Sequence, residues 1–410
     1  MSLMPSVSAS TYSSSSTIAI CGGGIGGLAA ALALKRAGFI PVVFERHSSE
    51  QIRDEGLFLT LAPNGCNAMR SFGLAEKVAA VGLPTRGLAV FNERGKRLTL
   101  IDYGGHATNY GAGSITLRRG ALAGVLLDAA LAAGILIHHD ADVTDIAQDT
   151  GGIVLTVNGE QRPFALALAC DGLRSTVRRL VFPQLPLPCY SGLIGTGGFA
   201  VAPDVASTDG LMNMVFGHRG FFGYIKQAGG PVYWFNSYPA KDAETGPVAD
   251  GVAYARKLAA MHEGDPLEVS SILAATTRVD RHYPIYDMPE LEQWSAGRVL
   301  LMGDAAHAVA PHSGQGASLA IEDGIVLAAC LKDNRDHIGA FARFERLRRQ
   351  RSHRAIAMGR AIGSQKAARS WLALRVRDLM LPIFMPMGTR MQEGFFNFRA
   401  DLTPLAQPTQ

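Results

Sequence analysis

The sequence is short of charge, of cysteine and of long apolar runs, and each shortage excludes a class of protein. Charged residues make up 18% of the 410 residues and the formal net charge is +4, so the whole chain is not a nucleic-acid-binding polycation. Five widely spaced cysteines without a CxxC pair argue against a disulfide framework or a zinc ribbon and favour a reducing cytoplasm. No apolar run reaches about 18 residues, so we expect no integral membrane segment.

The sequence is rich in apolar residues, and its composition changes along the chain. Hydrophobic residues amount to 48%, which excludes a disordered protein, and the length suggests two or three domains or one large composite. The pattern of residues 17–45 predicts a strand, a glycine turn, a helix and a second strand, whereas that of residues 181–280 predicts short aromatic strands, with few helix formers. We therefore predict an α/β fold (an α+β composite): a Rossmann-like nucleotide-binding domain, an inserted, mostly antiparallel β-sheet domain and C-terminal helices.

The predicted boundaries follow these changes of texture. Residues 1–16 contain eight serines and are interpreted as a disordered leader. Residues 17–180 plus 281–335 form the discontinuous nucleotide-binding domain, and residues 181–280 form the inserted sheet. Residues 336–400 form a C-terminal helical region, whose run of arginines we interpret as a solvated helix face rather than a nucleic-acid or membrane site.

A glycine-rich turn carries the first chemical signal. Gly22-x-Gly24-x-x-Gly27, with Gly26 inside it, lies between a predicted strand and a predicted helix. Glycines there permit a tight turn, close approach of a pyrophosphate and close helix–strand packing, while the helix N-terminus attracts phosphate. Glu45, 23 residues after Gly22, ends the next strand and is placed to accept hydrogen bonds from ribose hydroxyls. The pattern predicts a dinucleotide site, and by itself it leaves NAD and FAD open.

A second signal near residue 300 points to a cofactor longer than one nucleotide. The apolar run 299–302 ends in Gly303 and Asp304, and Asp304 could bind a polyol chain. Pro311 follows, and then Gly314, Gln315, Gly316 and Ala317 open a helix. The N-terminus of that helix would stabilise negative charge on an electron-rich ring.

Between these signals, Asp171 and Gly172 end another apolar strand, and Arg178 follows seven residues after Asp171. The three motifs, in this order and spacing, resemble the single-component, class A flavoprotein monooxygenases, the p-hydroxybenzoate-hydroxylase-like family. The resemblance covers about Thr17 to Arg360. It implies that the cofactor is FAD and that the inserted sheet binds the substrate.

Matched position by position, the resemblance implies a set of FAD-binding residues. These are Gly22, Gly24, Gly26, Gly27, Glu45, Arg46, Arg119, Asp171, Gly303, Asp304, Gly314, Gln315, Gly316 and Ala317. Pro311 and Phe58 would flank the flavin ring. Phe58 is a departure, because many relatives carry glycine there, and Ala121 replaces a usual acidic residue.

The resemblance also implies the reaction. FAD would be reduced by NADH or NADPH, a transient co-substrate because no second glycine turn of this kind occurs. Reaction with O2 would give a flavin C4a-hydroperoxide, which hydroxylates an aromatic or polycyclic small molecule, so no catalytic acid or base is expected. The alternatives are a flavin-dependent epoxidase or reductase of an isoprenoid or lipid-like substrate, and a non-enzymatic flavin-binding scaffold.

Aromatic residues of the inserted sheet are the candidate substrate contacts. By two-residue alternation, Phe222 and Tyr224 share one strand face and Tyr233 and Phe235 share another, while Trp234 points the opposite way. Plain packing in the sheet core is the competing interpretation for each. Four further side chains have only weak functional signals. We expect His218 and Arg219 to be solvated loop residues, and His307 and His312 to be packed histidines rather than metal ligands. The oligomeric state, monomer or homodimer, stays open.

Overall fold

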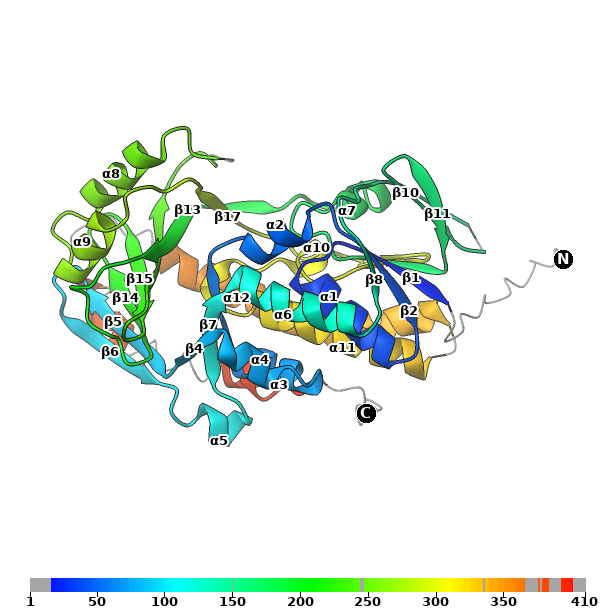
Figure 1. Ribbon diagram of the computed structural model, residues 1–410, viewed down its shortest axis with the longest axis horizontal. Helices are drawn as coiled ribbons and strands as arrows, with labels where there is room; N and C mark the ends of the chain where they lie inside the picture. Colours follow the sequence, from blue (N-terminus) through cyan, green and yellow to red (C-terminus); the bar gives the residue numbers. More distant parts are fainter. Residues whose placement is uncertain are drawn as a thin grey trace.

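The computed structural model describes residues 16–149, 151–243, 247–334, 336–365, 375–376, 378–382 and 392–400. Within these residues the strands form four sheets along an elongated molecule (Figure 1). The N-terminal βαβ unit lies at one end and the largest sheet lies at the other. Apart from Ser16, the predicted leader lies outside the described residues.

A six-stranded sheet forms the predicted Rossmann-like core, in the order β18-β19-β12-β1-β2-β8. Its strands are β1 (Thr17–Cys21), β2 (Ile40–Phe44), β8 (Leu136–His138), β12 (Leu166–Ala169), β18 (Ser295–Ala296) and β19 (Val299–Leu301). All neighbours are parallel except β18 and β19. The central strands are apolar on both faces because helices cover both sides of the sheet.

The helices around this sheet include α1 (Ile25–Arg36), α6 (Arg119–Ala132) and α11 (Gly316–Asp333). Helices α1 and α11 touch through their backbones, since a Cβ on Gly324 would lie 2.7 Å from the backbone of Ala30. This close crossing places the N-termini of α1 and α11 on a common framework, which is the arrangement that the two glycine signals require.

The largest sheet has seven strands in the order β17-β13-β16-β15-β14-β5-β6. They are β13 (Cys189–Ala200), β14 (Leu211–Phe216), β15 (Phe221–Lys226), β16 (Val232–Pro239), β17 (Tyr283–Asp287), β5 (Gly87–Asn92) and β6 (Arg97–Asp102). The pairing is antiparallel except between β14 and β5, as predicted for the inserted sheet. Helices α8 (Gly251–Met261) and α9 (Leu267–Ala274) pack on one face through an apolar core.

One part of the sheet departs from the predicted boundaries. Strands β5 and β6 come from the segment that we assigned to the nucleotide-binding domain, yet they extend the large sheet at the exposed edge of β14. Residues 87–92 read as one apolar strand whose partner lies more than 100 residues away, and sequence texture does not identify such a partner. The division into domains otherwise stays a prediction.

Two small sheets complete the fold: β3 (Phe58–Leu61), β7 (Ser114–Arg118) and β4 (Gly82–Thr85), and β11 (Glu160–Phe164), β10 (Ile153–Val157) and β9 (Val143–Gln148). The Asn158-Gly159 turn joins β10 to β11, with both residues at positive φ. After β11 the chain enters β12, whose four buried residues lie inside the parallel sheet and not in this hairpin.

The remaining helices connect and cover these sheets. They are α2 (Ser49–Asp54), α3 (Pro63–Ser71), α4 (Ala75–Ala80), α5 (His106–Tyr110), α7 (Thr176–Val181), α10 (Asp304–His307), the 3-10 turn η1 (Pro311–Ser313) and α12 (His337–Gln365). Helix α12 packs along α11 and η1. Among the described residues, no helix is both long and apolar enough to cross a bilayer.

Candidate functional site

The glycine turn after β1 is shaped by two close backbone contacts. A Cβ on Gly22, whose φ is +108°, would lie 2.4 Å from the carbonyl oxygen of Cys170, and one on Gly27 would lie 1.9 Å from the oxygen of Gly22. A Cβ on Gly24, by contrast, would meet nothing within 4 Å. Gly24 also begins α1 without any side-chain cap. The turn therefore presents bare backbone and a helix N-terminus to open space, as a phosphate cradle must.

The Glu45 carboxylate lies directly beside this turn. Its Oε2 accepts a hydrogen bond from the N–H of Gly23 at 2.6 Å, and its Oε1 accepts from the N–H of His47 at 2.9 Å. The side chain is 7% exposed, so the two N–H donors hold a nearly buried carboxylate in one orientation. Oε1 also lies 2.8 Å from His47 Nδ1, whereas Oε2 keeps a second lone pair for a hydroxyl donor.

Charged side chains gather around the Glu55 carboxylate. Arg119 Nη1 donates to Glu55 Oε2 at 2.7 Å, with both side chains partly exposed. Burial acts to raise the pKa of the Glu55 carboxyl, but Arg119, with His47 and Arg46, lowers it overall. Two predicted cofactor residues, Arg46 and Arg119, thus both act on the Glu55 carboxylate.

The Gly-Asp motif follows β19, which is separated from β1 by β12 in the six-stranded sheet. Gly303 has a φ of +53°, and its N–H donates to Asp323 Oδ2 at 3.1 Å. Asp304 begins α10, and solvent reaches its side chain. The surrounding protein nevertheless raises the pKa of its carboxyl through desolvation, partly offset by His307 and Arg119. Asp304 is therefore an accessible acceptor that neighbouring protein partly desolvates, which suits a polyol chain.

The loop from Pro311 to Ala317 presents open glycines. A Cβ on Gly314, whose φ is +63°, or on Gly316 would meet nothing within 4 Å. Gln315 precedes α11 without capping it, and its Oε1 accepts from Asn64 Nδ2 at 3.1 Å. The N-terminus of α11 thus carries two glycines with open space beside them.

Asp171 and Arg178 have partly structural roles. Asp171 Oδ2 accepts from the N–H of Val177 at 3.0 Å, and Oδ1 is buried without a partner among the described residues. Arg178 is 3% exposed and donates to the carbonyl oxygens of Ala305 and Leu173 at 2.7 and 2.6 Å. Arg178 therefore ties the Asp-Gly loop to the Gly-Asp helix.

Four half-buried aromatic rings meet beside the large sheet. The Phe58 ring lies 6.3 Å from that of Phe199, 5.5 Å from that of Tyr233 and 5.9 Å from that of Phe235. The Arg118 guanidinium stacks 4.1 Å from the centre of the Phe199 ring. We call Phe58, Phe199, Tyr233 and Phe235 the aromatic cluster. It joins two predicted substrate residues to the predicted flavin neighbour Phe58.

The other predicted pair, Phe222 and Tyr224, does not belong to this cluster. In the β15–β16 register Tyr224 lies opposite Trp234, so both point to the face covered by α8 and α9. The Phe222 ring stacks on Trp234 at 5.5 Å and is fully buried. Phe222 and Tyr224, which we predicted as substrate contacts, therefore lie on the face of the sheet opposite to Tyr233 and Phe235, because the register places them on the same face as Trp234.

The candidate histidines lie in different surroundings. His307 is 2% exposed and lies 2.6 Å from Asp323 Oδ2, while half-exposed His218 pairs with Asp265 on the face away from the aromatic cluster. His312 packs beside Gly363 of α12. No cluster that could hold a metal occurs in the part of the chain that the structure describes.

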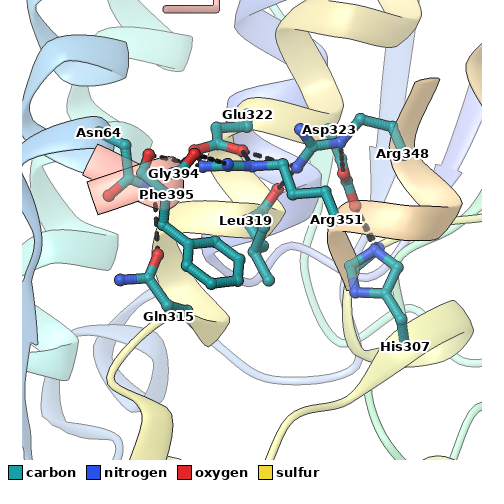
Figure 2. A network of polar contacts seen from close by, with 11 residues as sticks. Asn64, His307, Gln315, Leu319, Glu322, Asp323, Arg348, Arg351, Gly394 and Phe395 are labelled. Atoms are coloured by element: carbon teal, nitrogen blue, oxygen red, sulfur yellow. Dashed lines mark hydrogen bonds and ion pairs between the residues drawn. The ribbon is translucent and has the colours of Figure 1, made fainter. Parts of the chain in front are cut away.

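A buried network of ion pairs and hydrogen bonds joins α11 and α12 to the predicted cofactor loops, and it was not predicted from the sequence (Figure 2). On α11, Glu322 and Asp323 are fully buried; on α12, Arg348 is fully buried and Arg351 nearly so. Arg348 donates to Asp323 Oδ1 at 2.6 Å and contacts Glu322 Oε2 at 2.8 Å. The arginine-rich helix is therefore not wholly a solvated face. Adjacent acids within the apolar run 317–331 were the available signal, since buried charges require partners.

The chain is similar to known proteins along most of its length. A family model described as "FAD binding domain" matches residues 15–358. The chain is 30% identical over 370 residues to the aurachin C monooxygenase/isomerase of Stigmatella aurantiaca, covering 89% of this chain and 93% of that protein. It is 30% identical over 352 residues to the 2-heptyl-3-hydroxy-4(1H)-quinolone synthase of Pseudomonas aeruginosa, covering 82% and 87%. The structure of Klebsiella pneumoniae HpxO complexed with FAD and uric acid has the same fold, with a TM-score of 0.83, 23% identity and coverage of 93% and 97%.

Proposed function

The chain belongs to the single-component FAD-dependent monooxygenases, and we propose that it hydroxylates a bicyclic nitrogen heteroaromatic ring that carries an apolar chain. The aromatic cluster is the observation that carries this proposal. Its rings are half-buried, whereas Phe222 and Trp234 on the opposite face are fully buried, so the cluster retains surface for a flat ligand. The Pseudomonas relative is named for an alkylated quinolone, which supports this substrate class.

An apolar path from the cluster would receive the chain of the substrate. Phe235 also packs against a second apolar group that contains Phe221, Val90 and Leu381. A ring held by the aromatic cluster would therefore have apolar side chains on one side for an alkyl substituent. Burial of each methylene group would add about 0.8 kcal/mol to binding.

FAD, when bound, supplies the redox chemistry: it accepts electrons from NADH or NADPH and delivers one oxygen atom of O2 to the substrate. The residues of this chain bind and orient. We assign the pyrophosphate to the open backbone at Gly24, the adenosine ribose to Glu45 and the ribityl chain to Asp304. The N-terminus of α11 at Gly314–Ala317 would stabilise negative charge on the ring, and Pro311 and Phe58 would flank it. The aromatic cluster would position the substrate and exclude water.

A substrate panel tests this assignment. The protein loaded with FAD is supplied with NADH or NADPH and isotopically heavy O2, together with a 2-alkyl-4-quinolone, the unalkylated quinolone, a simple phenol or an isoprenoid alkene. We expect heavy oxygen in the product and the highest kcat/KM with the alkylated quinolone. Turnover of the isoprenoid alone would replace the proposal by an epoxidase, and failure of NADH and NADPH to reduce the FAD would favour a non-enzymatic role.

Removal of one ring from the aromatic cluster gives a sharper prediction. Tyr233→Ala deletes a ring that lies 4.8 Å from Phe199 and 5.5 Å from Phe58. We expect KM for the organic substrate to rise about tenfold, with more NAD(P)H consumed per product because water enters the site. Tyr286→Ala is the matched control, since Tyr286 pairs with Tyr190 elsewhere on the sheet. Equal KM values in both variants would contradict the assignment.

We also propose a cytoplasmic enzyme, monomeric or homodimeric, that binds no nucleic acid. All five cysteines are free thiols, which fits a reducing compartment that also holds NADH and NADPH.

A further inference from the structure

Residues 392–400, which we call the C-terminal strap, lie against α12 and are held there by Arg351. Arg351 Nη1 donates to the carbonyl oxygen of Gly394 at 2.9 Å, and Nη2 donates to that of Phe395 at 2.8 Å (Figure 2). The same guanidinium lies 4.9 Å from the centre of the Phe395 ring and 4.5 Å from that of Phe398. One side chain thus makes both polar and stacking contacts with the strap.

The guanidinium of Arg351 also binds the carboxylate of Glu322 through two hydrogen bonds. Nε donates to Oε2 at 2.9 Å and Nη2 donates to Oε1 at 2.8 Å, a paired arrangement that only arginine can make. The guanidinium therefore joins the strap to α11. Lysine at this position would keep the charge but would lose the geometry.

From Glu322 the contacts continue to the predicted flavin loop. Glu322 Oε1 also accepts from Asn64 Nδ2 at 2.6 Å, and the same Nδ2 donates to Gln315 Oε1 at 3.1 Å. Asn64 is 1% exposed, so these two acceptors fix the orientation of its amide. Direct contacts therefore run without a break from the strap through Arg351, Glu322 and Asn64 to Gln315.

Packing of the strap points the same way. Phe395 and Phe396 belong to an apolar cluster with Ala62, which precedes Asn64, and Leu319, which lies one turn along α11 from Gln315. Docking of the strap therefore buries apolar surface on both elements that carry the Asn64–Gln315 hydrogen bond.

We propose that Arg351 is a positioning residue that couples docking of the C-terminal strap to the cofactor-binding form of the Gly314–Ala317 loop. The inference rests on the proposed placement of FAD against that loop. Coupling between two binding events is reciprocal, so FAD must also favour the docked strap, by the same factor.

The affinity test uses a double-mutant cycle on the full-length protein. Kd for FAD is measured by fluorescence titration for Arg351→Lys, Phe395→Ala and the double variant. We expect each single change to raise Kd about tenfold, and the double variant to be little worse than either. Arg354→Met, at an exposed position on the same helix, is the control and should leave Kd unchanged. Fully additive effects, or unchanged Kd values, would overturn the proposal.

A second readout separates coupling from plain stability. Amide hydrogen exchange across residues 392–398 is compared with and without FAD. We expect FAD to slow exchange in the parent protein and to lose that effect in Arg351→Lys. A residue that merely stabilises the fold would change exchange equally in both states. If Gly24→Ala weakens FAD binding while Arg351→Lys does not, the coupling fails alone; if neither does, the placement of FAD fails.

Discussion

Gly24→Ala should raise the Kd for FAD at least about tenfold and leave the apoprotein as stable as the parent. The expectation of normal folding rests on two observations. The backbone at Gly24 has a φ of −72°, which alanine adopts without strain, and its Cβ would meet no atom within 4 Å. The same open space is where a pyrophosphate would approach the N-terminus of α1, so a methyl group there would obstruct the ligand alone.

Two matched changes make this test specific. Gly113→Ala also places a methyl group in open space at an ordinary φ, away from the turn, and should change neither stability nor FAD affinity. Gly27→Ala should instead destabilise the apoprotein, because its Cβ would lie 1.9 Å from the oxygen of Gly22. Fluorescence titration and urea unfolding of the three variants provide the measurements. An unchanged Kd in Gly24→Ala would show that the pyrophosphate does not lie over this turn.

The glycine turn was predictable because its demands are local. The spacing of Gly22, Gly24 and Gly27 encodes a strand-to-helix turn within six residues, and Glu45 directly follows the adjacent parallel strand. Parallel pairing of β1 with β2 then brings Glu45 to the turn without further information. The same reasoning held for α11, where glycines precede a long apolar helix.

The aromatic cluster was only partly predictable because it depends on which sheet face meets which element. Two-residue alternation correctly grouped Tyr233 with Phe235 and separated both from Trp234. It could not indicate that Phe222 shares the face of Trp234, since that follows from the register between β15 and β16. Phe199 was missed because β13 contributes it from a glycine-rich strand with little aromatic pattern.

The buried network was unpredictable for a different reason: its partners come from distant segments. Glu322 and Asp323 are adjacent on one helix, yet they point to different loops, Glu322 toward Asn64 and Asp323 toward Gly303. Successive residues of a helix are rotated by about 100° around its axis, so adjacent side chains point to different sides of the helix. Helix α11 thereby connects both predicted cofactor loops to α12.

Asp323→Asn should lower the free energy of unfolding by about 3–5 kcal/mol at neutral pH. Asp323 is fully buried, and its carboxylate contacts Arg348, His307 and the N–H of Gly303 together. An amide would leave the buried Arg348 guanidinium without its charge partner at Nε. Asp128→Asn is the control, because Asp128 pairs with Arg53 at the surface, where such pairs contribute about 0–1 kcal/mol.

The pH dependence of the same change gives an independent check with a defined sign. Arg348 and His307 outweigh the desolvation that would raise the Asp323 pKa, and they hold it at about 2 against an ordinary 3.8. A carboxyl with a depressed pKa in the folded state stabilises fully above its unfolded pKa and loses that stabilisation as the pH falls toward the folded value. The parent protein should therefore lose stability below about pH 4, and Asp323→Asn should lose less over the same interval. Urea unfolding between about pH 5 and pH 3 measures both slopes. Parallel slopes would mean that Asp323 takes up its proton equally readily in the folded and unfolded chains, and the buried ion pair would then not stabilise the junction between α11 and α12.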